Sequence, residues 1–538
     1  MTNRRSFLAA LGAGYAIANN SWAQSRQTAR AAGGSRSSEL FFTADTQYGQ
    51  VQGMANAGIK EFKGIPYGAP TSGKNRYMAP KKPAAWTGVR ECLAYGQISP
   101  QTISSPASDY GELIQWDLHY GTGMGEDVLT LNVWTPGLKD GGKRAVLVSF
   151  HGGGFATGSG NGPQYDGTQL ARLADCVVVT VNHRLASFGY LHLADLGAPA
   201  EFAHAGVAGM MDLVASLEWV RDNIENFGGD PSKVMIFGQS GGGAKTSTML
   251  AIPSAKGLFH SAGIQSGSTI RSATREQATK SAELLLAKLG VSKSNIADIQ
   301  KLPWQQILEA QTSLAGSAAF SPVVDGTILP HHPFDPTAPP ESAEVPIIIS
   351  NTLEDAALRL TNFDLTEEGL RTMMNQRYGA KAEAMLTMYR NRYPDKSAFL
   401  IQAQIATDST ARKSATLQAE RKAAQGKAPA YMYLWAFASG GFGGKFGAVH
   451  GTDVSATFNN YRDGVGGTGS EDERALWSRF ANSWVAMAKN ANPNNSKIPN
   501  WPAYDANTRA TMIFDKEVRV ENDPRSEIRK FWADMPSA

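Results

Sequence analysis

The chain has few cysteines, no long apolar segment and little net charge. Only two of its 538 residues are cysteine, so the fold does not depend on a network of disulfides. Beyond the N-terminal region, no segment is long enough and apolar enough to span a membrane. Arg4 and Arg5 supply two of the three net positive charges, which leaves about +1 for the residues after 23. This balance gives no reason to expect nucleic acid or an anionic membrane as a partner.

The composition favours one large α/β domain. A hydrophobic content of 42% over this length supports a sizeable core, which we expect to extend over residues 39–538. Residues 145–150 and 176–181 are apolar throughout rather than alternating, which is typical of strands covered by helices on both faces. Apolar residues at helical spacing predict a core-facing helix at 207–226. The Ala-, Glu-, Lys- and Gln-rich region 365–427 predicts inserted helices.

The N-terminus resembles an export signal. The paired arginines Arg4 and Arg5 precede a moderately apolar stretch at 8–18 and a small-x-small cleavage pattern that ends at Ala23. We therefore predict a twin-arginine-type signal peptide at 1–23 and a periplasmic or secreted protein. The Gly-, Ser- and Arg-rich residues 24–38 predict a disordered lead-in. The alternative, a basic start on an amphipathic helix, leaves the cleavage pattern without a role.

Ser240 lies in a Gly-x-Ser-x-Gly motif, Gly238-Gln239-Ser240-Gly241-Gly242. The motif follows a short apolar run typical of a buried strand and precedes residues that can form a helix. A serine on such a turn is exposed at the sheet edge, where the helix N-terminus favours negative charge. The alternatives are an incidental glycine-rich turn and a phosphate-binding loop. The latter would require Gly-Lys-Ser/Thr, which this motif lacks.

A second glycine motif, His151-Gly152-Gly153-Gly154-Phe155, also follows a predicted strand. Backbone N–H groups without neighbouring side chains can point at a substrate oxygen, and each such donor typically contributes about 2.7–4 kcal/mol to transition-state stabilisation. A flexible glycine-rich loop is the alternative. With both motifs in this order, we predict a nucleophilic Ser240 and an oxyanion hole formed by the N–H groups of Gly153, Gly154 and Gly241.

Further segments resemble a known family. They are FKGIPY (62–67), EDVLTLNVW (126–134), NHRL (182–185), FGGDP (227–231) and QSGS (265–268). Together with the glycine motifs they resemble type B carboxylesterases, the branch of the α/β-hydrolase fold that includes cholinesterase-like proteins. The resemblance implies a mostly parallel central sheet covered by helices on both faces, with helical insertions. It also implies a catalytic triad in the order serine, acid, histidine.

Chain order selects the candidate base. Only four histidines follow Ser240: His260, His331, His332 and His450. His450 follows an apolar run typical of a late strand, where this fold places its base. His331 and His332 lie in a Pro-rich stretch and are better explained as surface loop residues. We therefore predict His450 as the general base.

The candidate acid is one of two neighbours. The predicted strand at 346–349 leads to Glu354, Asp355 and Ala356, where family members usually have an acid-Glu-Gly triplet with the glutamate in the triad. Aligned by spacing, that glutamate falls on Asp355, whose shorter side chain requires the loop to approach the imidazole more closely. We predict Asp355 as the acid, with Glu354 as the alternative. The other carboxylate is expected to be solvated.

These residues predict an exported serine carboxylesterase that forms an acyl-enzyme intermediate on small-molecule esters. No cofactor and no metal are expected. The resemblance implies that Ser266 supports the acid and base through hydrogen bonds, and an ordinary buried serine is the alternative. The same machinery could cleave amides or lactones. A non-catalytic binding module is a further alternative, against which the presence of Ser240 and His450 argues.

Two features depart from the family. Relatives often close a loop with a disulfide whose positions correspond here to Ser99 and Val128, so the loop from 99 to 128 is expected to be mobile. Cys176 is expected in a buried strand. The sequence does not decide whether Cys92 and Cys176 form a disulfide.

Three aromatic residues are candidates for the wall of a substrate gorge. Trp116 and Tyr120 lie on the loop without the disulfide, and Phe155 adjoins the oxyanion glycines. Ordinary core packing is the alternative for each of them.

Overall fold

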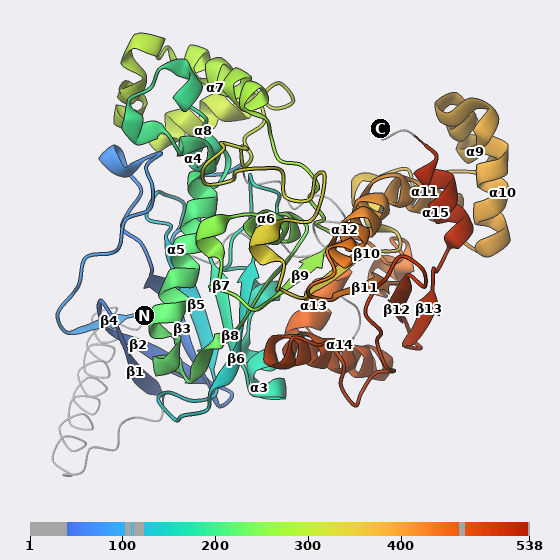
Figure 1. The fold of residues 1–538 in the computed structure, drawn as a ribbon, viewed down its shortest axis with the longest axis horizontal. Helices are drawn as coiled ribbons and strands as arrows, with labels where there is room; N and C mark the ends of the chain where they lie inside the picture. The colour runs from blue at the N-terminus through green and yellow to red at the C-terminus, as the bar shows by residue number, and fades with distance from the viewer. Residues whose placement is uncertain (1–39, 103–108, 110, 112–122, 462–468, 536–538) are drawn as a thin grey trace, which may run out of the picture. The chain divides into compact units, whose positions relative to one another are not determined.

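The strands of the chain join in one sheet whose spatial order differs from their order in the sequence (Figure 1). The computed structural model describes residues 40–102, 109, 111, 123–461 and 469–535. Within these residues the 13-stranded sheet has the order β1-β2-β3-β5-β7-β6-β8-β9-β10-β11-β12-β13, and β4 pairs with β2. The strands are β1 (Phe41–Thr46), β2 (Gly49–Asn56), β3 (Ile59–Pro66), β4 (Val89–Glu91), β5 (Thr130–Thr135), β6 (Arg144–Phe150), β7 (Val177–Val181), β8 (Gly229–Gln239), β9 (Ser261–Gln265), β10 (Ile347–Thr352), β11 (Ala430–Trp435), β12 (Ala510–Phe514) and β13 (Arg519–Asn522).

The centre of the sheet is parallel, as predicted. Every neighbouring pair from β7 through β6, β8, β9, β10 and β11 to β12 is parallel, whereas β2 with β3, β3 with β5, β5 with β7 and β12 with β13 are antiparallel. Parallel neighbours require crossover connections, and the helices supply them. The sheet therefore has the mostly parallel architecture of the α/β-hydrolase fold.

The helices include the predicted ones. The described helices are α3 (Thr168–Ala174), α4 (Ala186–Tyr190), α5 (Ala208–Asn223), α6 (Gly241–Met249), α7 (Arg275–Leu289), α8 (Trp304–Ser313), α9 (Glu367–Tyr378), α10 (Ala382–Arg392), α11 (Ala398–Thr407), α12 (Lys413–Ala424), α13 (Thr452–Phe458), α14 (Glu471–Asn490) and α15 (Ser526–Ala533). The helix predicted at 207–226 is α5 followed by one 3-10 turn, Ile224–Phe227. The inserted helices predicted at 365–427 are α9 to α12, between β10 and β11.

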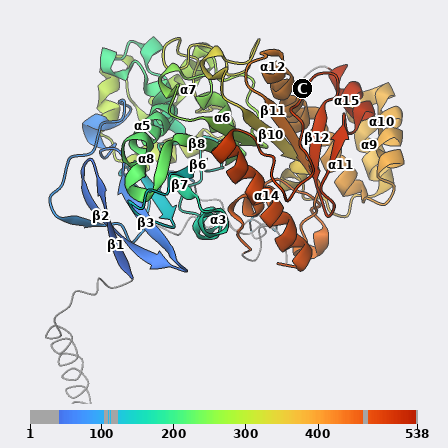
Figure 2. The ribbon, with the colours of Figure 1, turned by 60° about the horizontal axis from the view of Figure 1, so that its bottom comes forward.

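Alternate side chains of the central strands enter two separate cores. Val146 and Val148 of β6 join the core that includes α5, whereas Leu147 between them joins the core that includes α3 and α14. Figure 2 shows α3 and α14 on one side of the sheet and α5, α6 and α12 on the other. Strands buried on both faces need apolar residues at every position, which explains the absence of alternation in the sequence.

The parallel register brings several loops to one edge of the sheet. Phe150 pairs with Gly238 in the β6–β8 ladder, and Gln239 pairs with Gln265 in the β8–β9 ladder. Gln265 also lies beside Ser350 of β10. The residues that follow these strands therefore leave the sheet at the same carboxyl edge, where ligands bind in open α/β sheets.

The described residues from Phe42 onward form one compact unit. The predicted signal at 1–23 and lead-in at 24–38 lie outside the described residues. Within the described ranges, no helix combines the length and the apolar character needed to cross a membrane.

Candidate active site

Ser240 occupies a strained turn between β8 and α6. Its φ of 59° and ψ of −122° lie outside the regions that residues with a side chain ordinarily occupy. The turn is held from both sides, because the Ser240 N–H donates to the Gln265 carbonyl at 2.7 Å and the Ala244 N–H donates to the Ser240 carbonyl at 2.9 Å. This geometry places a serine directly before the first N–H groups of α6.

The second glycine motif forms a loop after β6 in which the N–H groups of Gly153 and Gly154 are free to donate. Gly153 and Gly154 have φ values of 90° and 64°, which favour glycine. Within the part of the chain that the structure describes, neither N–H donates to a protein acceptor. The loop is fixed instead through other atoms, since the Gly152 N–H donates to the Tyr165 hydroxyl at 3.0 Å and the Thr157 N–H donates to the Gly153 carbonyl at 3.0 Å.

Gly241 lets this loop approach the start of α6 closely. A Cβ atom at residue 241 would lie 2.2 Å from the Gly154 nitrogen and 2.5 Å from its Cα, distances that real contacts do not reach. The resemblance implies alanine at this position in most relatives. In this chain the backbones of residues 154 and 241 are therefore in contact without an intervening methyl group. The N–H groups of Gly154 and Gly241 lie close together as a result.

Lys245 holds the same loop from inside α6. The side chain is fully buried, and its Nζ donates to the carbonyls of His151 and Gly154, each at 2.8 Å. No carboxylate of the described residues pairs with this ammonium group. Burial lowers the pKa of Lys245 to about 7. The Phe155 ring lies over the ammonium group, with its centroid 5.8 Å from Nζ.

His450 and Asp355 are in direct contact. The Nδ1 atom of His450 lies 2.9 Å from Oδ1 of Asp355, and the two residues are 7% and 6% exposed. Their segments meet through a parallel bridge between Glu354 and Val449 and a hydrogen bond from the Glu354 N–H to the Ala448 carbonyl. When Nδ1 donates to the carboxylate, Nε2 is left as the acceptor of a proton.

The charge of Asp355 is stabilised despite burial. Burial acts to raise its pKa, but the nearby His450 and the hydrogen bonds from His450 and the Thr352 backbone outweigh it, so the pKa is lowered. The Ser266 hydroxyl makes no hydrogen bond of ordinary length and angle within the described residues. Ser266 is near enough to Asp355 to act on the pKa of its carboxyl group, but no hydrogen bond joins the two residues.

Glu354 is not the solvated loop carboxylate that the sequence suggested. It is completely buried, pairs with Lys396, and accepts hydrogen bonds from the Gln404 side chain and the Ala448 N–H, both at 2.8 Å. The expectation was wrong because the segment around Ala448 folds over the acid strand and excludes water from it. The two neighbouring acids thus face different partners, Asp355 the imidazole and Glu354 a lysine.

The remaining candidates lie elsewhere or in the core. His331 contacts Glu341 at 3.2 Å in a surface loop. Phe155 packs edge-to-face on Tyr190, with ring centroids 5.4 Å apart. Trp116 and Tyr120 lie outside the described residues.

The cysteines and the loop without the family disulfide can be placed in part. Cys92 and Cys176 are both free and buried, which excludes the bridge between them that the sequence left open. Ser99 and Val128 are buried, and the Ser99 hydroxyl accepts a hydrogen bond from the Leu185 N–H at 3.1 Å. Most of the loop between these two residues lies outside the described residues.

Comparison with known protein families identifies the chain. The model of the carboxylesterase family matches residues 42–532. The chain belongs to the carboxylesterase family. It is a carboxylic-ester hydrolase, as the predicted resemblance implied.

Two bacterial relatives share most of this carboxylesterase's length. Para-nitrobenzyl esterase of Bacillus subtilis is 32% identical over 499 residues, which cover 90% of this chain and 97% of the relative. Phenmedipham hydrolase of Pseudarthrobacter oxydans is 29% identical, with 88% and 95% covered. The matches extend over nearly whole chains rather than isolated motifs.

Solved structures of esterases have the same fold. A carboxylesterase of Geobacillus stearothermophilus matches this carboxylesterase with a TM-score of 0.77 and 33% identity, covering 91% of this chain and 99% of that one. An esterase of Clostridium hathewayi described as hydrolysing aliphatic aromatic polyesters matches with a TM-score of 0.79 and 28% identity, covering 91% and 98%. The family and the architecture therefore agree.

Sequence reasoning missed two buried groups near the site. Lys245 lies in the segment that is expected only to form a helix after the serine, and its acceptors, the carbonyls of His151 and Gly154, belong to a distant loop. Asp453, three residues after His450, is fully buried and accepts a hydrogen bond from the Tyr433 hydroxyl at 2.7 Å. Burial raises the pKa of Asp453.

Proposed function

We propose that this carboxylesterase uses Ser240, His450 and Asp355 as a catalytic triad. In the first step Nε2 of His450 takes the Ser240 hydroxyl proton while the serine oxygen attacks the acyl carbonyl of the ester. Asp355 fixes the imidazole tautomer and stabilises the imidazolium. His450 then protonates the leaving alcohol, and an acyl-enzyme on Ser240 remains. Water, deprotonated by His450, attacks the acyl-enzyme and releases the carboxylic acid.

The oxyanion of each tetrahedral intermediate receives hydrogen bonds from the N–H groups of Gly153, Gly154 and Gly241 in this proposal. The free N–H groups of Gly153 and Gly154 and the first-turn position of Gly241 support it. Lys245 acts as a positioning residue, because its ammonium group binds the carbonyls of His151 and Gly154 and so fixes the loop that carries the donors. Ser266 contributes through Asp355 alone.

The contact of 2.9 Å between His450 and Asp355, at the sheet edge that carries the strained Ser240 turn, is the observation that carries the proposal. Hydrolysis of p-nitrophenyl butyrate by the Ser240→Ala variant tests it. Removing a nucleophile of this kind lowers kcat by roughly 10⁴–10⁶-fold.

A Ser294→Ala variant is the matched control, since Ser294 is an exposed serine. It should hydrolyse the ester at the rate of the unchanged protein. A Ser240→Ala variant that is folded and retains its rate would show that the reaction does not proceed through Ser240.

Small-molecule carboxylic esters are the proposed substrates, with para-nitrobenzyl esters as the first class to examine because a relative is named for that activity. A rate panel that varies the acyl and alcohol groups separately would order these substrates.

We further propose export through the signal at 1–23. Paired Arg4 and Arg5 before an apolar stretch, and the small residues that end at Ala23, support it. Expressing the full chain with both arginines changed to lysine tests this assignment. Export and shortening by 23 residues should cease, whereas unimpaired export of the variant would contradict it.

A further inference from the structure

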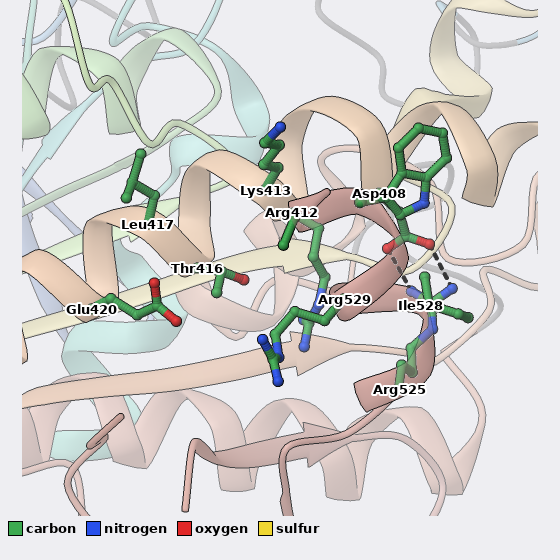
Figure 3. A pocket seen from close by; sticks show the side chains of 11 residues that line it. Asp408, Arg412, Lys413, Thr416, Leu417, Glu420, Arg525, Ile528 and Arg529 are labelled. Carbon is green, nitrogen blue, oxygen red and sulfur yellow. Dashed lines mark hydrogen bonds and ion pairs between the residues drawn. The ribbon is translucent and has the colours of Figure 1, made fainter. Parts of the chain in front are cut away.

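A cavity of about 230 Å³ lies beside the C-terminal helix, lined by residues from the π-helical turn Asp408–Arg412, from α12 and from α15 (Figure 3). Arg412 and Arg529 both line it, and Figure 3 shows their side chains reaching into the same space from different segments. Ser240, Asp355 and His450 do not belong to its lining. The cavity is therefore a separate feature from the candidate active site.

Arg412 is a buried cation with few hydrogen-bond partners. It is 9% exposed, and its only hydrogen bond within the described residues joins Nη1 to the side-chain oxygen of Asn351 at 3.3 Å. No carboxylate in the described part of the chain lies within ion-pair distance of its guanidinium group. Its Nε and Nη2 make no hydrogen bond within the described residues, and the side chain lines the cavity.

The carboxylates that line the cavity are already engaged. Asp408 accepts two hydrogen bonds of 2.7 Å from Arg525 and one of 2.7 Å from the Tyr389 hydroxyl. Glu420 pairs with Arg509 at 3.0 Å. Both carboxylates thus pair with other arginines, and Arg412 has no ion pair within the described residues.

The lining holds three cations besides Arg412, namely Lys413, Arg525 and Arg529, and of these Arg529 is paired on one side only. Its Nε and Nη2 each donate to the carboxylate of Asp523 at 2.7 Å, which leaves Nη1 for another acceptor. Burial of a guanidinium group without a counter-charge is unfavourable, so an anion in the cavity would stabilise this part of the protein. The π-helical turn that carries Arg412 is itself a rare feature that occurs frequently at functional sites.

Part of the lining is apolar. Ile528, Trp532 and Leu417 contribute hydrocarbon and aromatic surface to the same cavity. Guanidinium groups match carboxylate geometry, and apolar walls favour a hydrocarbon chain. We propose that this cavity binds a small organic carboxylate, with its head group on Arg412 and Arg529 and its chain against Ile528 and Trp532. This site is independent of ester hydrolysis at Ser240.

Hydrogen exchange on the intact, unmodified protein tests the site without depending on any variant. Exchange is measured with hexanoate, with hexan-1-ol and with inorganic phosphate, at constant ionic strength. Hexanoate should slow exchange in peptides covering 408–420 and 525–533. Hexan-1-ol lacks the charge and phosphate lacks the chain, so neither should match it.

The Arg412→Gln variant should bind hexanoate roughly tenfold more weakly by calorimetry, since the charge-assisted hydrogen bonds to the head group are lost. Arg371→Gln is the control, because Arg371 is an exposed arginine of α9 outside the cavity, and it should bind as the unchanged protein does. Absence of protection at 408–420 and 525–533 overturns the proposal. So does equal protection by hexan-1-ol, protection by phosphate alone, or protection by hexanoate confined to peptides around Ser240 and His450.

Discussion

Nδ1 of His450 lies 2.9 Å from Oδ1 of Asp355, whereas the adjacent Glu354 faces Lys396 instead. The two acids are neighbours in sequence, yet only one contacts the imidazole. This division predicts opposite consequences for two conservative substitutions.

Asp355→Asn should lower kcat for a p-nitrophenyl ester by about 10⁴-fold, because an amide at this position favours the wrong imidazole tautomer. Glu354→Gln should keep kcat within about tenfold while lowering the free energy of unfolding by ~1–3 kcal/mol, since it weakens a buried ion pair. Steady-state kinetics and urea denaturation of both variants provide the comparison. If Glu354→Gln alone abolished turnover, the acid would be Glu354.

Gly241→Ala should impair the oxyanion loop. The added methyl group would meet the Gly154 backbone at 2.2 Å, so the loop must move away from the serine. Moving the oxyanion donors away from the serine weakens their hydrogen bonds in the transition state. This displacement should lower kcat by roughly ten- to a hundredfold, with a smaller effect on KM. Steady-state kinetics on a p-nitrophenyl ester measures both constants.

Gly369→Ala is the matched control for that substitution. Gly369 lies in α9, and an added methyl group would meet side-chain atoms of Leu365 and of Thr366, whose hydroxyl accepts the hydrogen bond of the Gly369 N–H. Activity should be unchanged, and the free energy of unfolding should change by no more than about 1 kcal/mol, because the better helix propensity of alanine opposes these close contacts. Equal activity of both alanine variants would mean that the loop yields freely.

Lys245 should make stability depend on pH. Its pKa in the folded protein is about 7, below the ordinary value of 10.5, so the unfolded chain binds the extra proton between these values. The free energy of unfolding therefore rises with pH between these two pKa values. Below the lower value both states hold the proton, and Lys245 no longer makes stability depend on pH. From pH 6.5 to 8.5 the change should be about 2 kcal/mol.

Urea denaturation of the unchanged protein and of Lys245→Met at these two pH values isolates the effect, because titrating groups that do not interact with Lys245 cancel in the difference. The stability of the unchanged protein relative to the variant should increase between pH 6.5 and 8.5. A difference that stays constant would show that Lys245 is not a buried, uncompensated amine.

The buried thiols should be unreactive. Burial raises the pKa of Cys92 and that of Cys176 to about 12, so almost no thiolate exists near neutral pH. The native protein should react with Ellman's reagent far more slowly than the urea-denatured protein, which should release two equivalents per chain. Rapid release of one equivalent from the native protein would contradict this placement.

Much of the fold was predictable because the central strands are apolar on both faces, as Val146, Leu147 and Val148 illustrate. The serine and histidine candidates also follow from sequence, since chain order leaves His450 as the only histidine after a late strand. The two acids could not be separated in this way, because the sequence does not show that the segment around Ala448 pairs with Glu354. The role of Lys245 depends on carbonyl groups of a distant loop, and no local pattern records them.

The central claim is that Ser240 carries the acyl group between the two half-reactions. Rapid mixing with a p-nitrophenyl ester, acid quenching within the first turnover and mass spectrometry of the intact protein and its peptides measure this directly. The account predicts a mass increase of one acyl group, located on the peptide that contains Ser240 and absent from Ser240→Ala. Full turnover with no adduct, or an adduct on another residue, would contradict it.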